Sequence, residues 1–120
     1  MKVNYLAHAV LAKPNLYSLT GNLLGDFCKG MPLDTLHPDI RAGLLNHRAT
    51  DSFTDQHPEV RQLKTLFSPT RRRFAGIALD VLFDHFLIRH WQQFYSTTFA
   101  DYKQQLYADL AAAEPLMPVV

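Results

Sequence analysis

Three side chains that can bind a cation recur at four-residue intervals in the stretch 47–58. His47, Asp51 and Asp55 occupy positions i, i+4 and i+8, which a helix places along one stripe of its surface. One imidazole and two carboxylates can share a divalent cation. Because His47 and Asp55 would lie about 12 Å apart along the helix axis, a single ion can bind only one neighbouring pair. The alternative is a solvated helix face with ordinary polar pairs.

Two predicted helices near the N-terminus carry polar pairs at the same spacing. Asn4 and His8 form one pair, Asn22 and Asp26 form the other, and both pairs stand among apolar neighbours. A buried polar pair must find hydrogen-bond partners or water. His8 and Asp26 are therefore candidates for a binding site. The alternatives are a hydrogen-bonded core histidine and a carboxylate at a solvated helix edge.

Two glycines lie on the same side of the second of these helices as its polar pair. Gly21 and Gly25 each cost a helix about 1 kcal/mol relative to alanine. Small residues at such positions suggest that another helix or a ligand approaches the backbone closely.

Two carboxylates in the most apolar segment of the chain are the strongest indication of a site. Asp80 and Asp84 lie one turn apart in the predicted helix 70–91, which is apolar nearly all round, and His85 follows Asp84. Carboxylates in such surroundings are costly unless they are paired, protonated or bound to a metal. We expect this helix to be central in the fold.

Three cations open the same predicted helix. Arg71, Arg72 and Arg73 would lie in its first turn, where the helix dipole disfavours positive charge. Because these cations lower the stability of the helix, the cluster suggests that an anionic partner binds there. The alternative is that the long arginine stems cover apolar surface.

Helical periodicity accounts for most of the chain, and no convincing strand alternation or internal repeat occurs. Residues 16–19 are expected to be a connector, with Ser18 or Thr20 as the cap of the helix that follows. We predict an all-α fold, a single compact domain spanning residues 1–120 with about six helices. The predicted helices are 3–12, 21–29, 38–56, 59–67, 70–91 and 101–113.

Length, charge and cysteine content narrow the class of protein. A chain of 120 residues suits one domain, and a net charge of +1 gives no global attraction to nucleic acid or to an anionic membrane. The single cysteine, Cys28, excludes an internal disulfide and a zinc site built on cysteines of this chain. The best apolar run is short, and the N-terminus is a poor signal peptide, so we expect a cytoplasmic protein. Serine or cysteine covalent catalysis has no motif to support it.

Four motifs taken together resemble the bacterial acyl carrier protein phosphodiesterases, also called ACP hydrolases. The motifs are Asn4-Tyr5-Leu6-Ala7-His8, Gly21-Asn22-Leu23-Leu24-Gly25-Asp26-Phe27, His47-Arg48-x-x-Asp51-x-x-Thr54-Asp55 and Leu79-Asp80-x-x-x-Asp84-His85-Phe86-Leu87. The resemblance implies an HD-domain-like, all-helical member of the HD phosphohydrolase superfamily. It implies removal of the 4'-phosphopantetheine arm from holo-acyl carrier protein with a divalent cation, typically manganese.

Two features depart from the pattern of that superfamily and family. The His-Asp dipeptide that usually binds metal in HD enzymes is absent, and the nearest element is the reversed pair Asp84-His85. Members of the family are also longer, so we expect this chain to lack C-terminal helices that they possess.

The expected chemistry assigns roles to the candidate residues. A divalent metal would polarise the phosphoryl oxygen and supply a hydroxide, and oxygen-rich ligands with one or two histidines suit Mn²⁺, with Mg²⁺ as the alternative. The predicted ligands are Asp26, His47, Asp51 and Asp84, with His8 and Asp55 next in line. His85 or Asp55 is predicted to protonate the serine leaving oxygen, and Arg48 to bind a phosphate oxygen.

Carrier proteins are strongly acidic, so docking is expected to use cations. The predicted docking residues are Arg71, Arg72, Arg73, Arg61 and Lys64. Two other functions are compatible with the sequence: a non-catalytic helical module that binds an acidic partner, and an HD-type phosphohydrolase that acts on a nucleotide or another small phosphoester. Asp and His within apolar helices argue against the pure binding module, and only the resemblance favours the carrier protein over a nucleotide.

Overall fold

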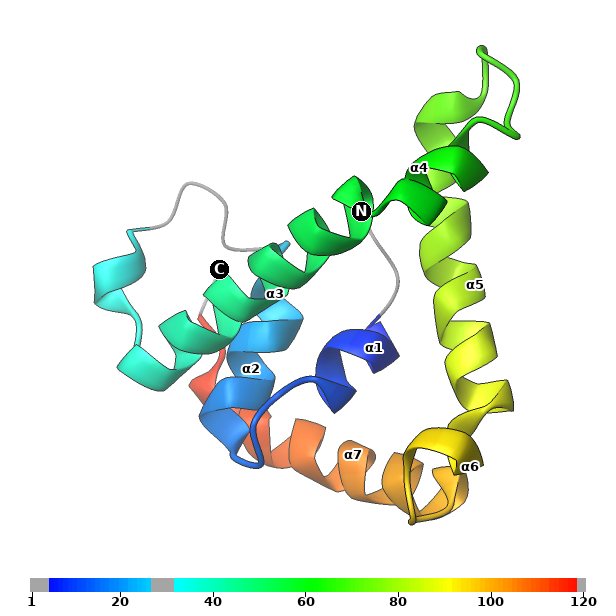
Figure 1. The fold of residues 1–120 in the computed structure, drawn as a ribbon. Coiled ribbons are helices and arrows are strands. Elements are labelled where there is room, and N and C mark those ends of the chain that lie inside the picture. Colours follow the sequence, from blue (N-terminus) through cyan, green and yellow to red (C-terminus); the bar gives the residue numbers. More distant parts are fainter. Residues whose placement is uncertain (1–4, 27–31, 119–120) are drawn as a thin grey trace.

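The computed structural model describes residues 5–26 and 32–118, and within these ranges every regular element is a helix (Figure 1). The prediction of an all-α fold is therefore confirmed. The α-helices are α1 (Tyr5–Val10), α2 (Leu16–Leu24), α3 (Pro38–Gln56), α4 (Pro58–Lys64), α5 (Ala75–Arg89), α6 (Trp91–Phe94) and α7 (Phe99–Ala113). Short 3₁₀ turns are η1 (Leu33–Thr35), η2 (Arg72–Phe74) and η3 (Glu114–Leu116).

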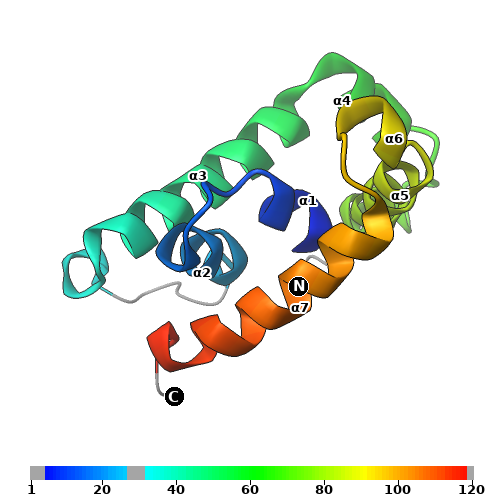
Figure 2. The same cartoon turned by 90° about the horizontal axis from the view of Figure 1, so that it is seen from below.

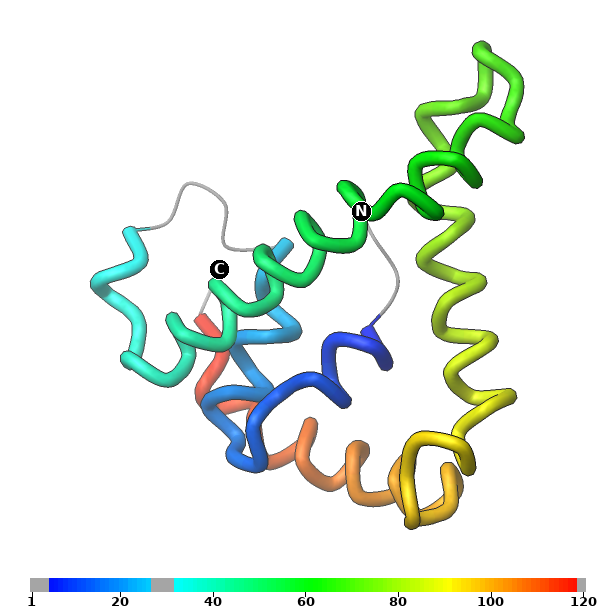
Figure 3. Tube along the Cα trace, viewed as in Figure 1, coloured from blue at the N-terminus to red at the C-terminus, as the bar shows by residue number. Residues whose placement is uncertain are grey.

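The packing of α2 against α3 is the most extensive contact between helices. The short helix α1 lies between α3 and α7, as the view from below shows (Figure 2). From the far end of α3 the chain passes through α4 and returns along α5 to α6 and α7 (Figure 3). The buried apolar side chains are Ala9, Leu19, Ile40, Leu44, Ala75, Leu79, Trp91 and Ala113. These residues come from every α-helix except α4.

Helix α2 begins five residues earlier than its sequence pattern predicts. The side chain of Asn15 caps it, because Asn15 Oδ1 accepts a hydrogen bond from the backbone N–H of Ser18 at 2.7 Å. Asparagine is among the best N-cap residues, and it takes the role expected of Ser18 or Thr20. The prediction of a connector over 16–19 is therefore wrong. The last predicted turn of this helix, 27–29, lies outside the described residues.

The long helix α3 has the predicted bounds, 38–56. Pro38 stands in its first turn, where a missing N–H costs nothing. Pro58 begins α4, and between the two helices the ring nitrogen Nδ1 of His57 accepts a hydrogen bond from the backbone N–H of Glu59 at 3.2 Å. The stripe that carries the candidate ligands is therefore continuous and straight through α3.

Two expectations for the segment 70–91 are wrong. The α-helix starts only at Ala75 with no side-chain cap, so the three arginines precede it and do not occupy its first turn. The helix is also peripheral, since it packs mainly on α1 and η2 within the described part of the chain. Five of its large apolar side chains are between 40% and 51% exposed: Ile77, Val81, Leu82, Phe86 and Ile88. An apolar sequence alone does not show which faces of a helix pack against other elements.

Gly21 permits the close approach of α2 to α3, and we predict that Gly21→Ala destabilises the fold. An added Cβ would lie 2.0 Å from the carbonyl oxygen of Ile40 and 2.8 Å from the backbone nitrogen of Leu44. Backbone atoms cannot move aside as a flexible side chain does, so the helices must separate, at a cost of about 1–3 kcal/mol in the free energy of unfolding.

Gly76 provides the matched control, because nothing lies within 4 Å of a Cβ added there. Gly76→Ala, within α5, is expected to be neutral or to stabilise the protein by up to about 1 kcal/mol. Urea unfolding of both variants measures the difference. Equal stability of the two variants would contradict the close contact between α2 and α3.

Candidate metal centre

Two histidines and two carboxylates come together where α1, α2 and α3 meet. His8 comes from α1, His47 and Asp51 come from α3, and Asp26 lies two residues after the end of α2. The Nε2 atom of His8 lies 3.1 Å from Asp51 Oδ1. The Nε2 atom of His47 lies 3.4 Å from Asp51 Oδ2 and 3.4 Å from Asp26 Oδ1. We refer to these four residues as the His/Asp cluster.

Both histidines of the cluster are buried, each with 1% of its side chain exposed. Their rings stack at a centroid distance of 3.6 Å and an interplanar angle of 15°. Gly25 leaves the space for this stack, since a Cβ at that position would lie 2.2 Å from two ring carbons of His47. Gly25 therefore serves the position of the His47 ring as well as the packing of the helix.

The backbone carbonyl of Asn22 fixes the tautomer of His47. It makes a short hydrogen bond with His47 Nδ1, and because a carbonyl oxygen can only accept, Nδ1 must carry the proton and donate. In a neutral ring the lone pair then lies on Nε2, which is buried and has no hydrogen-bond partner among the described residues. A lone pair that faces two carboxylates is unfavourable unless a proton or a cation lies between them.

Donor atoms of three cluster residues are close enough to bind one ion. One ligand atom each from His8, His47 and Asp51 lies within 4.8 Å of the other two. Asp26 Oδ1, at 3.4 Å from His47 Nε2, adds a fourth possible donor. This set of two imidazoles and two carboxylates fits a divalent cation.

The pKa of His8 favours its neutral form. Burial lowers this pKa below the ordinary value of 6.5, the neighbouring His47 lowers it further, and the charge of Asp51 opposes both effects. A metal binds the neutral imidazole, so the shift favours the form of His8 that can act as a ligand.

A match to a family of known proteins covers nearly the whole chain. The family profile described as "Acyl carrier protein phosphodiesterase" matches residues 3–120. The chain belongs to the acyl carrier protein phosphodiesterase family.

Relatives in this family carry the same description. The acyl carrier protein phosphodiesterase of Serratia proteamaculans (strain 568) is 44% identical over 117 residues, which are 97% of this chain and 61% of the relative. That of Escherichia coli O139:H28 (strain E24377A / ETEC) is 50% identical over 91 residues, 76% of this chain and 47% of the relative. The matches thus cover about half to three fifths of the length of these curated relatives. No solved structure matches the chain.

The other candidate ligands from the acyl carrier protein phosphodiesterase motifs lie outside the cluster. Asp84 Oδ1, on α5, accepts a hydrogen bond from the backbone N–H of Ala7 at 3.1 Å. Burial raises the pKa of Asp84, and backbone hydrogen bonds from α1 oppose the shift. Asp55 lies one turn beyond Asp51, and its Oδ1 accepts from Lys64 Nζ at 3.4 Å.

The candidates for proton transfer and phosphate binding are on different faces. His85 is exposed on α5, with its ring edge against Phe86 at a centroid distance of 5.4 Å. Arg48 is half-buried on α3 beside His47. Of the two, only Arg48 adjoins the cluster in sequence. Sequence reasoning also missed the role of the Asn22 carbonyl, because no pattern of side chains reports a backbone acceptor.

The predicted docking residues gather at one end of the protein. Figure 1 shows α4 and the segment after it extending beyond the start of α5, and we call the residues there the basic projection. Arg72 Nη2 donates to the carbonyl oxygens of Phe67, at 3.2 Å, and Thr65, at 3.5 Å. Part of the positive charge therefore stabilises the turn that follows α4. The members of the basic projection are Arg61, Lys64, Arg71, Arg72 and Arg73.

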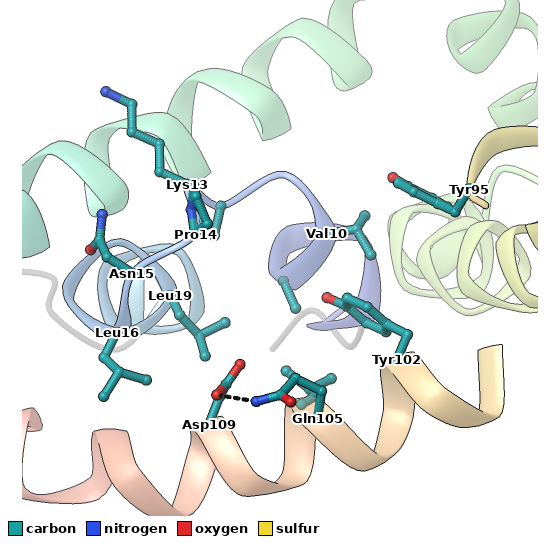
Figure 4. Close-up of a pocket in the computed structure, with 13 residues that line it drawn as sticks. Val10, Lys13, Pro14, Asn15, Leu16, Leu19, Tyr95, Tyr102, Gln105 and Asp109 are labelled. Carbon is teal, nitrogen blue, oxygen red and sulfur yellow. Dashed lines mark hydrogen bonds between the residues drawn. The ribbon is translucent and has the colours of Figure 1, made fainter. Parts of the chain in front are cut away.

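A cavity of about 490 Å³ lies away from the cluster, between the α1–α2 connection and α7 (Figure 4). Its lining includes the polar residues Tyr95, Tyr102, Gln105 and Asp109, and none of its lining residues belongs to the His/Asp cluster. The candidate metal ligands therefore do not line this cavity. No described helix is both long and apolar enough to cross a membrane.

Proposed function

We propose that this chain carries the divalent-metal site of a phosphodiesterase that removes the 4'-phosphopantetheine arm from holo-acyl carrier protein. The observation that carries the proposal is the buried Nε2 of His47, which the Asn22 carbonyl orients toward the carboxylates of Asp26 and Asp51. The name of the relatives supports the choice of substrate. Such a substrate is intracellular, so we also propose a cytoplasmic location.

His8, Asp26, His47 and Asp51 would hold the metal, which when bound supplies Lewis-acid polarisation of the phosphoryl oxygen and a water of lowered pKa. Two imidazoles beside two carboxylates favour Mn²⁺ over Mg²⁺, which prefers oxygen ligands. The carbonyl of Asn22 keeps the proton of His47 on Nδ1 and thereby keeps Nε2 available.

Two further roles complete the proposal. Arg48, on the same helix as His47, would bind a phosphate oxygen, since its guanidinium can donate two parallel hydrogen bonds. Asp55 or His85 would protonate the serine oxygen that leaves, and both assignments remain predictions. Membership of the HD phosphohydrolase superfamily likewise remains a prediction.

Intact-mass analysis of holo-acyl carrier protein tests the reaction directly. The carrier protein is incubated with this chain and Mn²⁺, with and without a chelator. We expect loss of the phosphopantetheine mass with Mn²⁺ and no loss with the chelator. A folded chain that binds no Mn²⁺, measured by electron paramagnetic resonance, would contradict the metal site. Turnover that persists in chelator would contradict the metal-dependent mechanism.

We predict that the basic projection determines the affinity for the acidic carrier protein. The double variant Arg71→Glu/Arg73→Glu reverses two exposed charges and leaves Arg72, which holds the turn after α4. The apparent KM for holo-acyl carrier protein is expected to rise by about tenfold or more at low salt, because electrostatic steering is lost. The kcat should change little, because neither residue belongs to the cluster.

A control with the same change in net charge is available elsewhere on the surface. Arg89 on α5 and Lys103 on α7 are exposed and lie outside the basic projection. Arg89→Glu/Lys103→Glu should leave the KM and its salt dependence near those of the unaltered chain. If both double variants raise the KM equally, the docking surface is not the basic projection.

A further inference from the structure

The helix that carries His8 is too short to hold its own position. Within the described residues helix α1 spans six positions, Tyr5–Val10, and isolated helices of this length are not stable in water. It packs mainly on α2 and α5. His8 nevertheless stacks on His47 and lies 3.1 Å from Asp51 Oδ1, so something must fix α1 along its axis.

Asp84 makes the polar contact between α5 and the first turn of α1. Its Oδ1 accepts a hydrogen bond from the backbone N–H of Ala7 at 3.1 Å, and the backbone of Leu6 also acts to lower the pKa of this carboxyl group. The first N–H groups of a helix have no partner within the helix. A carboxylate there satisfies them and complements the positive end of the helix dipole.

The hydrogen bond between Asp84 and Ala7 lies next to a candidate metal ligand in the sequence. Ala7 directly precedes His8, so a displacement of the first turn moves the imidazole as well. Metal–ligand distances are held within about 0.2 Å in proteins, so a small displacement of α1 is enough to weaken a shared ion.

We propose that Asp84 is a positioning residue whose carboxylate holds the first turn of α1, so that His8 stacks on His47 and faces Asp51. Asp84 thereby acts through a backbone hydrogen bond and does not bind the metal itself. The effect on metal affinity rests on the proposed function, whereas the effect on the position of His8 does not.

Two substitutions distinguish a positioning residue from a ligand. Asp84→Asn keeps an oxygen that can accept from Ala7 and removes the charge, whereas Asp84→Ala removes both. For a positioning residue, Asp84→Ala should weaken Mn²⁺ binding by about 10- to 100-fold, as loss of an outer hydrogen-bond partner does. Asp84→Asn should stay within about threefold of the unaltered chain.

The position of His8 is measured without metal, from the NMR resonances of the two histidine rings in the metal-free protein. We expect shifted resonances for His8 in Asp84→Ala and unaltered ones in Asp84→Asn. Thr98→Ala is the matched control, since Thr98 Oγ1 caps α7 by accepting from the N–H of Asp101 at 3.1 Å, and α7 contributes no residue to the cluster. It should leave the His8 resonances and Mn²⁺ affinity unchanged.

The outcomes separate this proposal from the proposed function. Loss of Mn²⁺ binding in folded Asp84→Asn far beyond about threefold would overturn positioning in favour of ligation, and this criterion does not depend on whether Asp84→Ala folds. Unaltered His8 resonances in folded Asp84→Ala would overturn it as well. If the unaltered chain binds no Mn²⁺, the proposed function fails, and the metal-free resonances still decide the role of Asp84.

Discussion

Replacement of Asp51 by asparagine is expected to abolish Mn²⁺ binding and phosphodiesterase activity together. The two carboxylate oxygens of Asp51 face different histidines, Oδ1 toward His8 Nε2 and Oδ2 toward His47 Nε2. An asparagine offers one carbonyl oxygen and one NH₂ group, and the NH₂ group cannot bind a cation. We expect the affinity for Mn²⁺ to fall by more than about 100-fold, beyond the loss that follows removal of an outer partner.

The matched control for this substitution lies on the same helix. Asp39 is exposed in the first turn of α3, about 18 Å from Asp51 along the helix axis, and Asp39→Asn should leave affinity and activity unchanged. Circular dichroism establishes that each variant is folded, and calorimetric titration with Mn²⁺ gives the affinities. Asp26→Asn should behave as Asp51→Asn does. Full activity in both ligand variants would rule out the His/Asp cluster as the metal centre.

Periodicity predicts the part of this cluster that lies on one helix. His47 and Asp51 are four residues apart, and prolines at 38 and 58 mark both ends of their helix, so its bounds follow from sequence. His8 comes from α1, and Asp26 lies just after the end of α2. Their polar character indicates that they need partners, but only the packing of α1 and α2 on α3 shows which partners they have.

The two errors on the segment 70–91 have a common physical cause. An apolar pattern indicates which side chains gain from burial, but not how many neighbours they receive. The sequence of α5 therefore predicts a central helix, although the side chain of Val81 is 51% exposed. In the same way, a run of arginines in the sequence indicates a cluster of charges available to a partner. In the structure Arg72 donates hydrogen bonds to two backbone carbonyls at the end of α4, and residue spacing in the sequence does not predict such bonds.

Gly25→Ala is expected to disrupt the proposed metal centre without removing any of its proposed ligands. The backbone of Gly25 is right-handed, with φ −55° and ψ −33°, so alanine is compatible with it. The added Cβ, however, would lie 2.2 Å from His47 Cδ2 and Cγ. The ring cannot move freely, because His8 stacks on it and Asn22 holds its Nδ1. We expect a loss of Mn²⁺ affinity of more than about 100-fold, the size expected for a displaced ligand, and a destabilisation of about 1–3 kcal/mol.

A double-mutant cycle shows whether the collision with the imidazole is the cause. In a His47→Ala background the imidazole is absent, so the added methyl group has room. Gly25→Ala should therefore lower the free energy of unfolding only slightly there. Urea unfolding of the four metal-free proteins gives the coupling free energy between the two positions. An equal cost of Gly25→Ala in both backgrounds would mean that the glycine serves the packing of α2 and not the imidazole. A cost confined to the background that retains His47 would show that this glycine serves the position of the imidazole.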